Sequence, residues 1–166
     1  MLWPNNKRLA LMLSFDIDAE TLWLTRNEIN KNHPANLSRG LYSVKQGIPR
    51  ILRMLEEENQ HATFFTTAYT AELHPEVIKC IAACGHEIAY HGYLHEVYDT
   101  YEKENALMAK AENIIKGLTG RQMVGQRSPD GFIYDLYTIF TFSCGWTGDI
   151  FIPPTGAITT GRSCTK

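Results

Sequence analysis

Features that readily assign a function are scarce in this 166-residue sequence. Acidic and basic residues nearly balance, 18 against 16, and the net charge of −2 gives no electrostatic case for binding nucleic acid or an anionic membrane. No apolar run is long enough to span a bilayer, so we expect no membrane span. The N-terminal apolar run ends in Asp-Ile-Asp rather than in the small-residue cleavage site of a secretory signal, which predicts a cytoplasmic protein.

Cysteine is also sparse, with four residues and no CxxC pair, which argues against a disulfide framework or a cysteine-ligated zinc site. Cys80 and Cys84 stand four residues apart in a predicted helix, where we expect small core side chains, and Cys144 and Cys164 lie in the C-terminal tail. We expect reduced thiols at all four positions. The GxGxxG, P-loop and GxSxG patterns are absent, so dinucleotide, phosphate-loop and serine-hydrolase chemistry have no support.

Strand and helix patterns alternate between residues 9 and 123, within what we expect to be one domain. A polar loop over 25–41 follows the first strand and is expected to shape a substrate cleft. The alternation predicts an α/β fold with a parallel sheet or barrel, whose active site lies beyond the carboxyl ends of the strands. The predicted strands are 9–15, 62–67, 86–91 and 122–127, and the predicted helices are 44–58, 74–85 and 99–120, the last capped by Asp99.

Three of the predicted strands end in residues that carry chemistry. Asp16 and Asp18 end the first and point to the same face, because side chains alternate along a strand. His91 and His95 follow the third strand, and a helical turn there would bring both rings to one side. Arg127 ends the fourth. A buried carboxylate needs a partner, and two imidazoles with a carboxylate suit a catalytic divalent metal, zinc first, with cobalt, manganese or iron as alternatives.

Each of these patterns also has an ordinary structural explanation when taken alone. An HxxxH pair, a DxD or a single arginine is common without any metal, and only their joint placement at successive strand ends indicates a site. Glu20 shares the parity of the two aspartates and is expected either to join the site or to start the loop. His86 is expected to be a turn residue, and His74 is expected to lie away from the site.

Three segments resemble the motifs of one family, the polysaccharide deacetylases or NodB-homology domains. They are "SFDIDAE" at 14–20, "HGYLH" at 91–95 and "GQRSP" at 125–129. The resemblance extends over about 9–129, and its branch contains peptidoglycan deacetylase-like enzymes and related cyclic amide and imide hydrolases. It implies a deformed (β/α) barrel, incomplete at its C-terminal end. Residues 1–129 would be the N-terminal and central part of the catalytic domain, and 130–166 an atypical tail.

The resemblance also implies roles for individual residues. Asp18, His91 and His95 would hold the metal, Asp16 would be the general base, and Arg127 would orient Asp16. No other cofactor is implied. The implied substrate is an N-acetylated sugar or another small molecule, hydrolysed at an amide C–N bond. The family's general acid is usually a histidine from a later motif, and no histidine follows Arg127 in this sequence.

Other functions compete with carbohydrate or peptidoglycan N-deacetylation. A cytoplasmic location favours hydrolysis of a cyclic amide, imide or ureide, because peptidoglycan lies outside the cell. The absent late histidine favours a catalytically impaired metal-binding fragment. An iron oxygenase with two histidines and one carboxylate shares the ligand set, but the strand–helix alternation argues against it. Open sheet edges in an incomplete barrel would favour either a homo-oligomer or aggregation.

Overall fold

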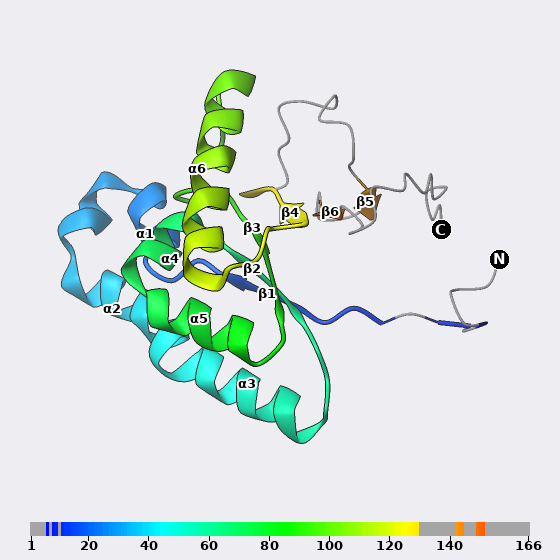
Figure 1. Cartoon of the computed structure of the whole chain (residues 1–166). Helices are drawn as coiled ribbons and strands as arrows, with labels where there is room; N and C mark the ends of the chain where they lie inside the picture. Colours follow the sequence, from blue (N-terminus) through cyan, green and yellow to red (C-terminus); the bar gives the residue numbers. More distant parts are fainter. Residues whose placement is uncertain (1–5, 7, 10, 130–141, 145–148, 152–166) are drawn as a thin grey trace.

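The protein is built around one mainly parallel β-sheet (Figure 1). The structure, a computed structural model, describes residues 6, 8, 9, 11–129, 142–144 and 149–151. Strands β1 (Ser14–Ile17), β2 (Thr63–Thr66), β3 (Glu87–Tyr90) and β4 (Gly125–Arg127) are parallel in that order. β6 (Asp149–Phe151) pairs antiparallel with β4, and β5 (Phe142–Cys144) pairs antiparallel with β6. The predicted α/β fold with a parallel sheet is confirmed.

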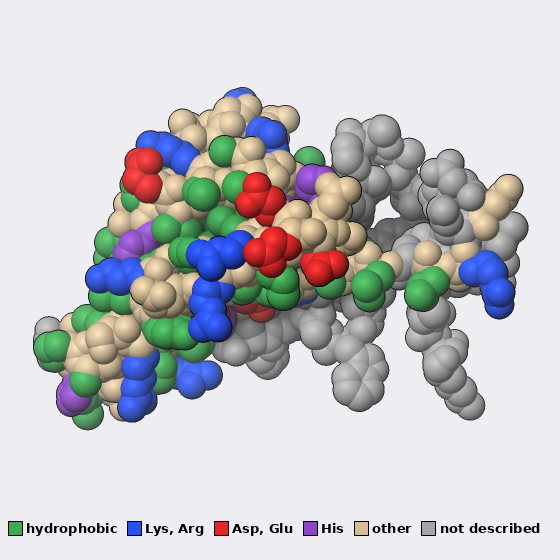
Figure 2. Space-filling model, turned by 90° about the horizontal axis from the view of Figure 1, so that it is seen from below, with side chains coloured by type: hydrophobic (Ala, Val, Ile, Leu, Met, Phe, Trp, Pro, Cys, Tyr) green, Lys and Arg blue, Asp and Glu red, His purple; other side chains and the backbone are tan. Residues whose placement is uncertain are grey.

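Helices connect the parallel strands. They are α1 (Thr21–Arg26), a 3-10 turn (Glu28–Asn32), α2 (Pro34–Tyr42), a π-helical turn (Ser43–Gly47), α3 (Ile48–Glu57), α4 (Ala68–Leu73), α5 (Pro75–Ala83) and α6 (Tyr101–Thr119). Within the described ranges no helix is both long and apolar enough to cross a membrane. Acidic and basic side chains lie near one another in Figure 2, and neither sign of charge forms a broad patch over the described part of that face.

The register of the strands separates a packed face from a chemical face. Ile17, Phe64 and Ile88 lie on the packed face, where residues of α3, α5 and α6 complete the main hydrophobic core. In Figure 1 these three helices lie on one side of the parallel strands. Asp16 and Phe65 are neighbours in register on the opposite face. Side chains alternate along each strand, so Asp18 and His91, just beyond β1 and β3, continue the chemical face.

The first strand begins later than the sequence predicts. β1 starts at Ser14, and the preceding Leu9, Leu11 and Met12 are 79%, 81% and 72% exposed. β2 begins at Thr63, opposite Ser14, so residues before Leu13 have no neighbouring strand in the described structure. Their apolar character therefore does not indicate a buried strand, and the predicted strand 9–15 is wrong in its first half.

The predicted helix 44–58 is interrupted. A π-helical turn ends at Gly47 before α3 begins, and the Ile48 amide donates to the Ser43 carbonyl. Pro49 explains the interruption, because proline lacks an amide hydrogen and its ring clashes with the carbonyl four residues earlier. The apolar spacing runs through this break, so periodicity alone does not reveal it.

Several local predictions are also corrected. Cys80 and Cys84 are exposed rather than in the core, since α5 buries Ile78, Ile81 and Ala82 on its other side. Thr100, not Asp99, caps α6, and its Oγ1 accepts the Lys103 amide at 3.3 Å. Residues 25–41, predicted as a loop, are largely helical. Two short strands, β5 and β6, lie in the region predicted to be an irregular tail, whose other residues, with Cys164, are outside the described ranges.

Candidate metal centre

A tight turn after β1 carries the first candidate ligand. Asp18 directly follows β1, and Ala19 has a left-handed backbone with φ of 47°. The Thr21 amide and hydroxyl both donate to the Asp18 carbonyl, at 2.9 and 2.6 Å. Gly40 of α2 packs directly against this turn, since a Cβ added to Gly40 would lie 2.6 Å from the Ala19 carbonyl oxygen. The carboxylate is therefore presented by a closely packed backbone.

The two histidines come together through a loop, not the helical turn that their spacing suggested. The chain leaves β3 at His91, and Gly92 and His95 both have left-handed φ values, 78° and 59°. A Cβ on Gly92 would also lie 2.9 Å from the Pro129 side chain. Both the left-handed φ and this close approach therefore favour glycine at this position. The ring centroids of His91 and His95 are 5.0 Å apart and the rings meet edge to face.

Asp18, His91 and His95 converge. One ligand atom from each residue lies within 4.8 Å of the others, and His91 Nε2 is 3.5 Å from Asp18 Oδ1. His91 Nδ1 donates to the Arg127 carbonyl oxygen at 2.7 Å, which leaves Nε2 as the ring nitrogen that faces Asp18. Two imidazoles and one carboxylate form a donor set suited to a divalent cation with open coordination positions. The residues present therefore fit a metal.

Asp16 and Arg127 form an ion pair beside these residues. Arg127 Nη1 donates to Asp16 Oδ1, while Nη2 donates to Ser14 Oγ at 3.0 Å. The guanidinium also lies over the Phe65 ring, 4.1 Å from its centroid. The Arg127 side chain is only 16% exposed and the Asp16 side chain is 38% exposed. The arginine is thus held on three sides, while the carboxylate it contacts remains open to solvent.

Two buried tyrosines support the histidine loop. The hydroxyls of Tyr90 and Tyr98 are 2.6 Å apart, and the Tyr93 amide donates to the Tyr98 hydroxyl at 3.3 Å. Burial raises the pKa of Tyr98 to about 12 and also raises the pKa of Tyr90, so both hydroxyls keep their hydrogens near neutral pH. These two tyrosines were not predicted to belong to the site, because aromatic side chains close to a motif carry no signal of such a hydrogen bond.

Glu20 and His74 also prove to be linked. His74 Nε2 lies 2.9 and 3.1 Å from the two Glu20 carboxylate oxygens, and both side chains are mostly buried. Glu20 is thus not one of the three converging ligands, and it does not begin an unstructured loop. His74 packs against the turn that follows Asp18. His86 lies between the turn at 84–85 and β3, close to its expected place, and its side chain is buried beside Phe64.

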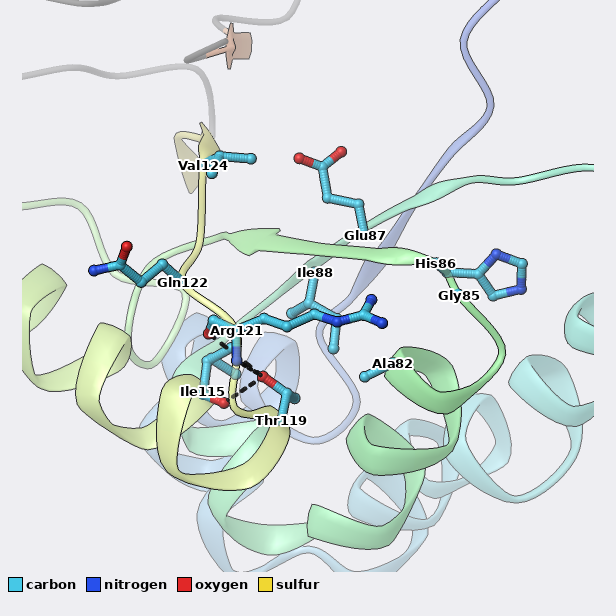
Figure 3. A pocket seen from close by; sticks show the side chains of 10 residues that line it. All are labelled: Ala82, Gly85, His86, Glu87, Ile88, Ile115, Thr119, Arg121, Gln122 and Val124. Carbon is cyan, nitrogen blue, oxygen red and sulfur yellow. Dashed lines mark hydrogen bonds between the residues drawn. The ribbon is translucent and has the colours of Figure 1, made fainter. Parts of the chain in front are cut away.

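A cavity of about 240 Å³ lies at the opposite ends of the strands (Figure 3). Its walls come from the end of α5, the start of β3, the end of α6 and the segment before β4. Glu87 begins β3 there, four residues before His91, and its carboxylate accepts a hydrogen bond from Thr63. In Figure 3 the Thr119 hydroxyl donates a hydrogen bond to the Ile115 carbonyl and accepts one from the Arg121 amide. This cavity is therefore separate from the candidate metal centre.

Comparison with known proteins identifies the family. A family model described as Polysaccharide deacetylase matches residues 38–147. A peptidoglycan deacetylase of Helicobacter pylori is 34% identical over 125 residues, covering 74% of this chain and 42% of the relative. A crystal structure assigned to a polysaccharide deacetylase from Mycobacterium smegmatis has a TM-score of 0.76 and 36% identity, covering 80% of this chain and 47% of that one. This chain belongs to the polysaccharide deacetylase family.

A second solved structure widens the range of related chemistry. PuuE allantoinase matches with a TM-score of 0.64 and 25% identity, over 77% of this chain and 50% of that one. The sheet is therefore of the polysaccharide deacetylase type, as the sequence motifs implied. The chain spans half or less of the length of each of these relatives.

Proposed function

We propose that this protein is part of a metal-dependent hydrolase of amide C–N bonds, acting as an N-deacetylase on an acetylated carbohydrate such as peptidoglycan. The observation that carries the proposal is the convergence of Asp18, His91 and His95 beside the Asp16–Arg127 ion pair. Membership of the family and likeness to a peptidoglycan deacetylase support the same substrate class. Zinc is the first expectation for the metal, and cobalt, manganese and iron accept the same ligands.

The residues divide the chemistry between them. A divalent cation held by Asp18, His91 and His95 would polarise the amide carbonyl and lower the pKa of an attacking water. Asp16 is exposed enough to reach that water and accepts its proton as general base. Arg127 holds the Asp16 carboxylate in place through the ion pair. Hydrolysis releases acetate and leaves a free amine on the sugar.

Two substitutions separate binding from catalysis. Asp18→Ala is expected to abolish metal binding, because it removes the only carboxylate among the three converging ligands. Asp16→Ala is expected to retain the metal and lose about 100-fold or more of the activity, because general base catalysis contributes roughly 10²–10⁴-fold. Elemental analysis gives metal atoms per chain, and acetate release from an N-acetylglucosamine oligomer gives activity. Equal activity in Asp16→Ala and the parent would refute the base assignment.

A second candidate is hydrolysis of a cyclic amide, imide or ureide. The likeness to PuuE allantoinase favours it, since that protein lies within the same fold and aligns over most of this chain. Ring opening of allantoin and acetate release from the sugar oligomer, measured side by side, distinguish the two candidates. Turnover of neither substrate by a metal-loaded chain would count against both candidates.

A further inference from the structure

Helix α4 contacts both halves of the candidate metal centre. Its first two amides, from Ala68 and Tyr69, donate to the carbonyls of Gly92 and Tyr93 at 3.1 and 2.9 Å. These carbonyls belong to the loop between His91 and His95. From the next residue of the helix, Thr70 Oγ1 donates to the Asp18 carbonyl at 2.9 Å, across 52 residues of sequence. α4 is drawn beside α1 in Figure 1, at the ends of the strands where both halves meet.

Three fully buried threonines surround the Asp18 carbonyl. Thr21 and Thr70 each donate their hydroxyl hydrogen to that oxygen, and Thr67 donates its own to Thr70 Oγ1 at 2.7 Å. Each hydroxyl carries one hydrogen, so all three hydrogens are used in this direction. The 3.3 Å contact between Thr21 and Thr67 is then a packing contact without a hydrogen of its own. Thr67 thereby directs the Thr70 hydroxyl toward Asp18.

The hydrogen bonds from these threonines hold a strained part of the backbone. The peptide that Thr70 contacts joins Asp18 to Ala19, whose left-handed φ of 47° is unfavourable for a residue with a Cβ. Surrounding contacts must maintain such a conformation. Thr21 belongs to the same turn and moves with it, whereas Thr70 is fixed to the helix that also binds the histidine loop. The hydrogen bond from Thr70 therefore connects the Asp18 backbone directly to the helix that binds the loop of the two imidazoles.

We propose that Thr70 is a positioning residue that sets the carboxylate of Asp18 against His91 and His95 for cation binding. The inference rests on the proposed metal site and adds to it a residue outside the three sequence motifs. Outer partners of metal ligands typically change affinity by about 10–100-fold when removed. Loss of the Thr70 hydroxyl is therefore expected to weaken cation binding by about tenfold or more while the fold is retained.

The experiment compares the full chain with three variants, using Co²⁺ alone as the probe. Thr70→Val removes the hydroxyl at nearly constant volume, and Thr70→Ser restores it. Thr66→Val is the matched control, because Thr66 is equally buried and its hydroxyl donates to the neighbouring Thr67 carbonyl, at 3.2 Å, rather than to Asp18. We expect the Co²⁺ dissociation constant to rise in Thr70→Val alone. The circular dichroism spectra of all the chains are expected to be similar. Thr70→Ala replaces Thr70→Val if the latter does not fold.

Two results would overturn the inference in a parent that binds Co²⁺. One is unchanged affinity in Thr70→Val. The other is a loss that is not specific to the Thr70 hydroxyl, shown by an equal loss in Thr66→Val or in Thr70→Ser. A parent that binds no Co²⁺ refutes the proposed metal centre instead, and NMR of the metal-free chain then tests Thr70. The carbonyl and carboxyl ¹³C signals of Asp18 are expected to shift in Thr70→Val and not in Thr66→Val. Unchanged Asp18 signals would overturn the inference independently of the metal.

Discussion

Replacing Gly40 by alanine tests how closely α2 packs on the turn that carries Asp18. In a free helix this change stabilises by about 1 kcal/mol, because alanine is the better helix former. Here the new Cβ would lie 2.6–2.7 Å from three backbone atoms of Ala19 and Glu20, which cannot rotate away. Overpacking of this kind costs about 1–3 kcal/mol, and rigid backbone neighbours place it near 3. We expect a net loss of about 2 kcal/mol in the free energy of unfolding.

Gly117 provides the control of opposite sign. It lies inside α6, and an added Cβ would meet nothing within 4 Å. Gly117→Ala is therefore expected to stabilise by about 1 kcal/mol. At about 2–4 °C per kcal/mol for a chain of this size, thermal unfolding should show a fall of about 4–8 °C for Gly40→Ala and a rise of about 2–4 °C for Gly117→Ala. A rise in both variants would refute the close packing of α2 on the turn.

Other substitutions test the buried aromatic groups. Tyr98→Phe is expected to lower the free energy of unfolding by about 1–3 kcal/mol, because the Tyr93 amide loses its acceptor. Urea denaturation measures this, and equal midpoints for the parent and Tyr98→Phe would contradict it, with the exposed Tyr101→Phe as control. Burial, with nearby His61, lowers the pKa of His86, so the unfolded chain binds its proton first as pH falls below about 6.5. The parent should therefore lose stability from pH 7 to pH 5, and His86→Phe should lose less; identical pH profiles would contradict this cause.

The parallel strands were predictable because their signals are local. The run Thr63–Thr66, for example, is β-branched and aromatic, and a helical stripe over 74–85 follows it. The candidate ligands were predictable from their places at the strand ends. The route that brings His91 and His95 together was not, because it depends on left-handed residues in a loop rather than on helical spacing.

The helix that organises the site was the main element missed. α4 has only six residues, "AYTAEL", which is too short to display an apolar stripe. Its role depends on Thr70 reaching a carbonyl 52 residues away, and such a contact leaves no periodic trace in the sequence. Before β1 the error was an element predicted where there is none. The apolar residues there were predicted to form a buried strand, but no neighbouring strand covers them in the described structure.

The candidate ligands come from β1 and β3, two strands separated by β2 in the sheet. A cation held as proposed would therefore act as a cross-link between chain segments 73 residues apart, from Asp18 to His91. Mass action then couples its concentration to folding: at about 100 times the dissociation constant it would add about 2.7 kcal/mol to the stability of the native state. Protein made in metal-poor medium would accordingly unfold and be degraded more readily than the same protein supplied with the cation.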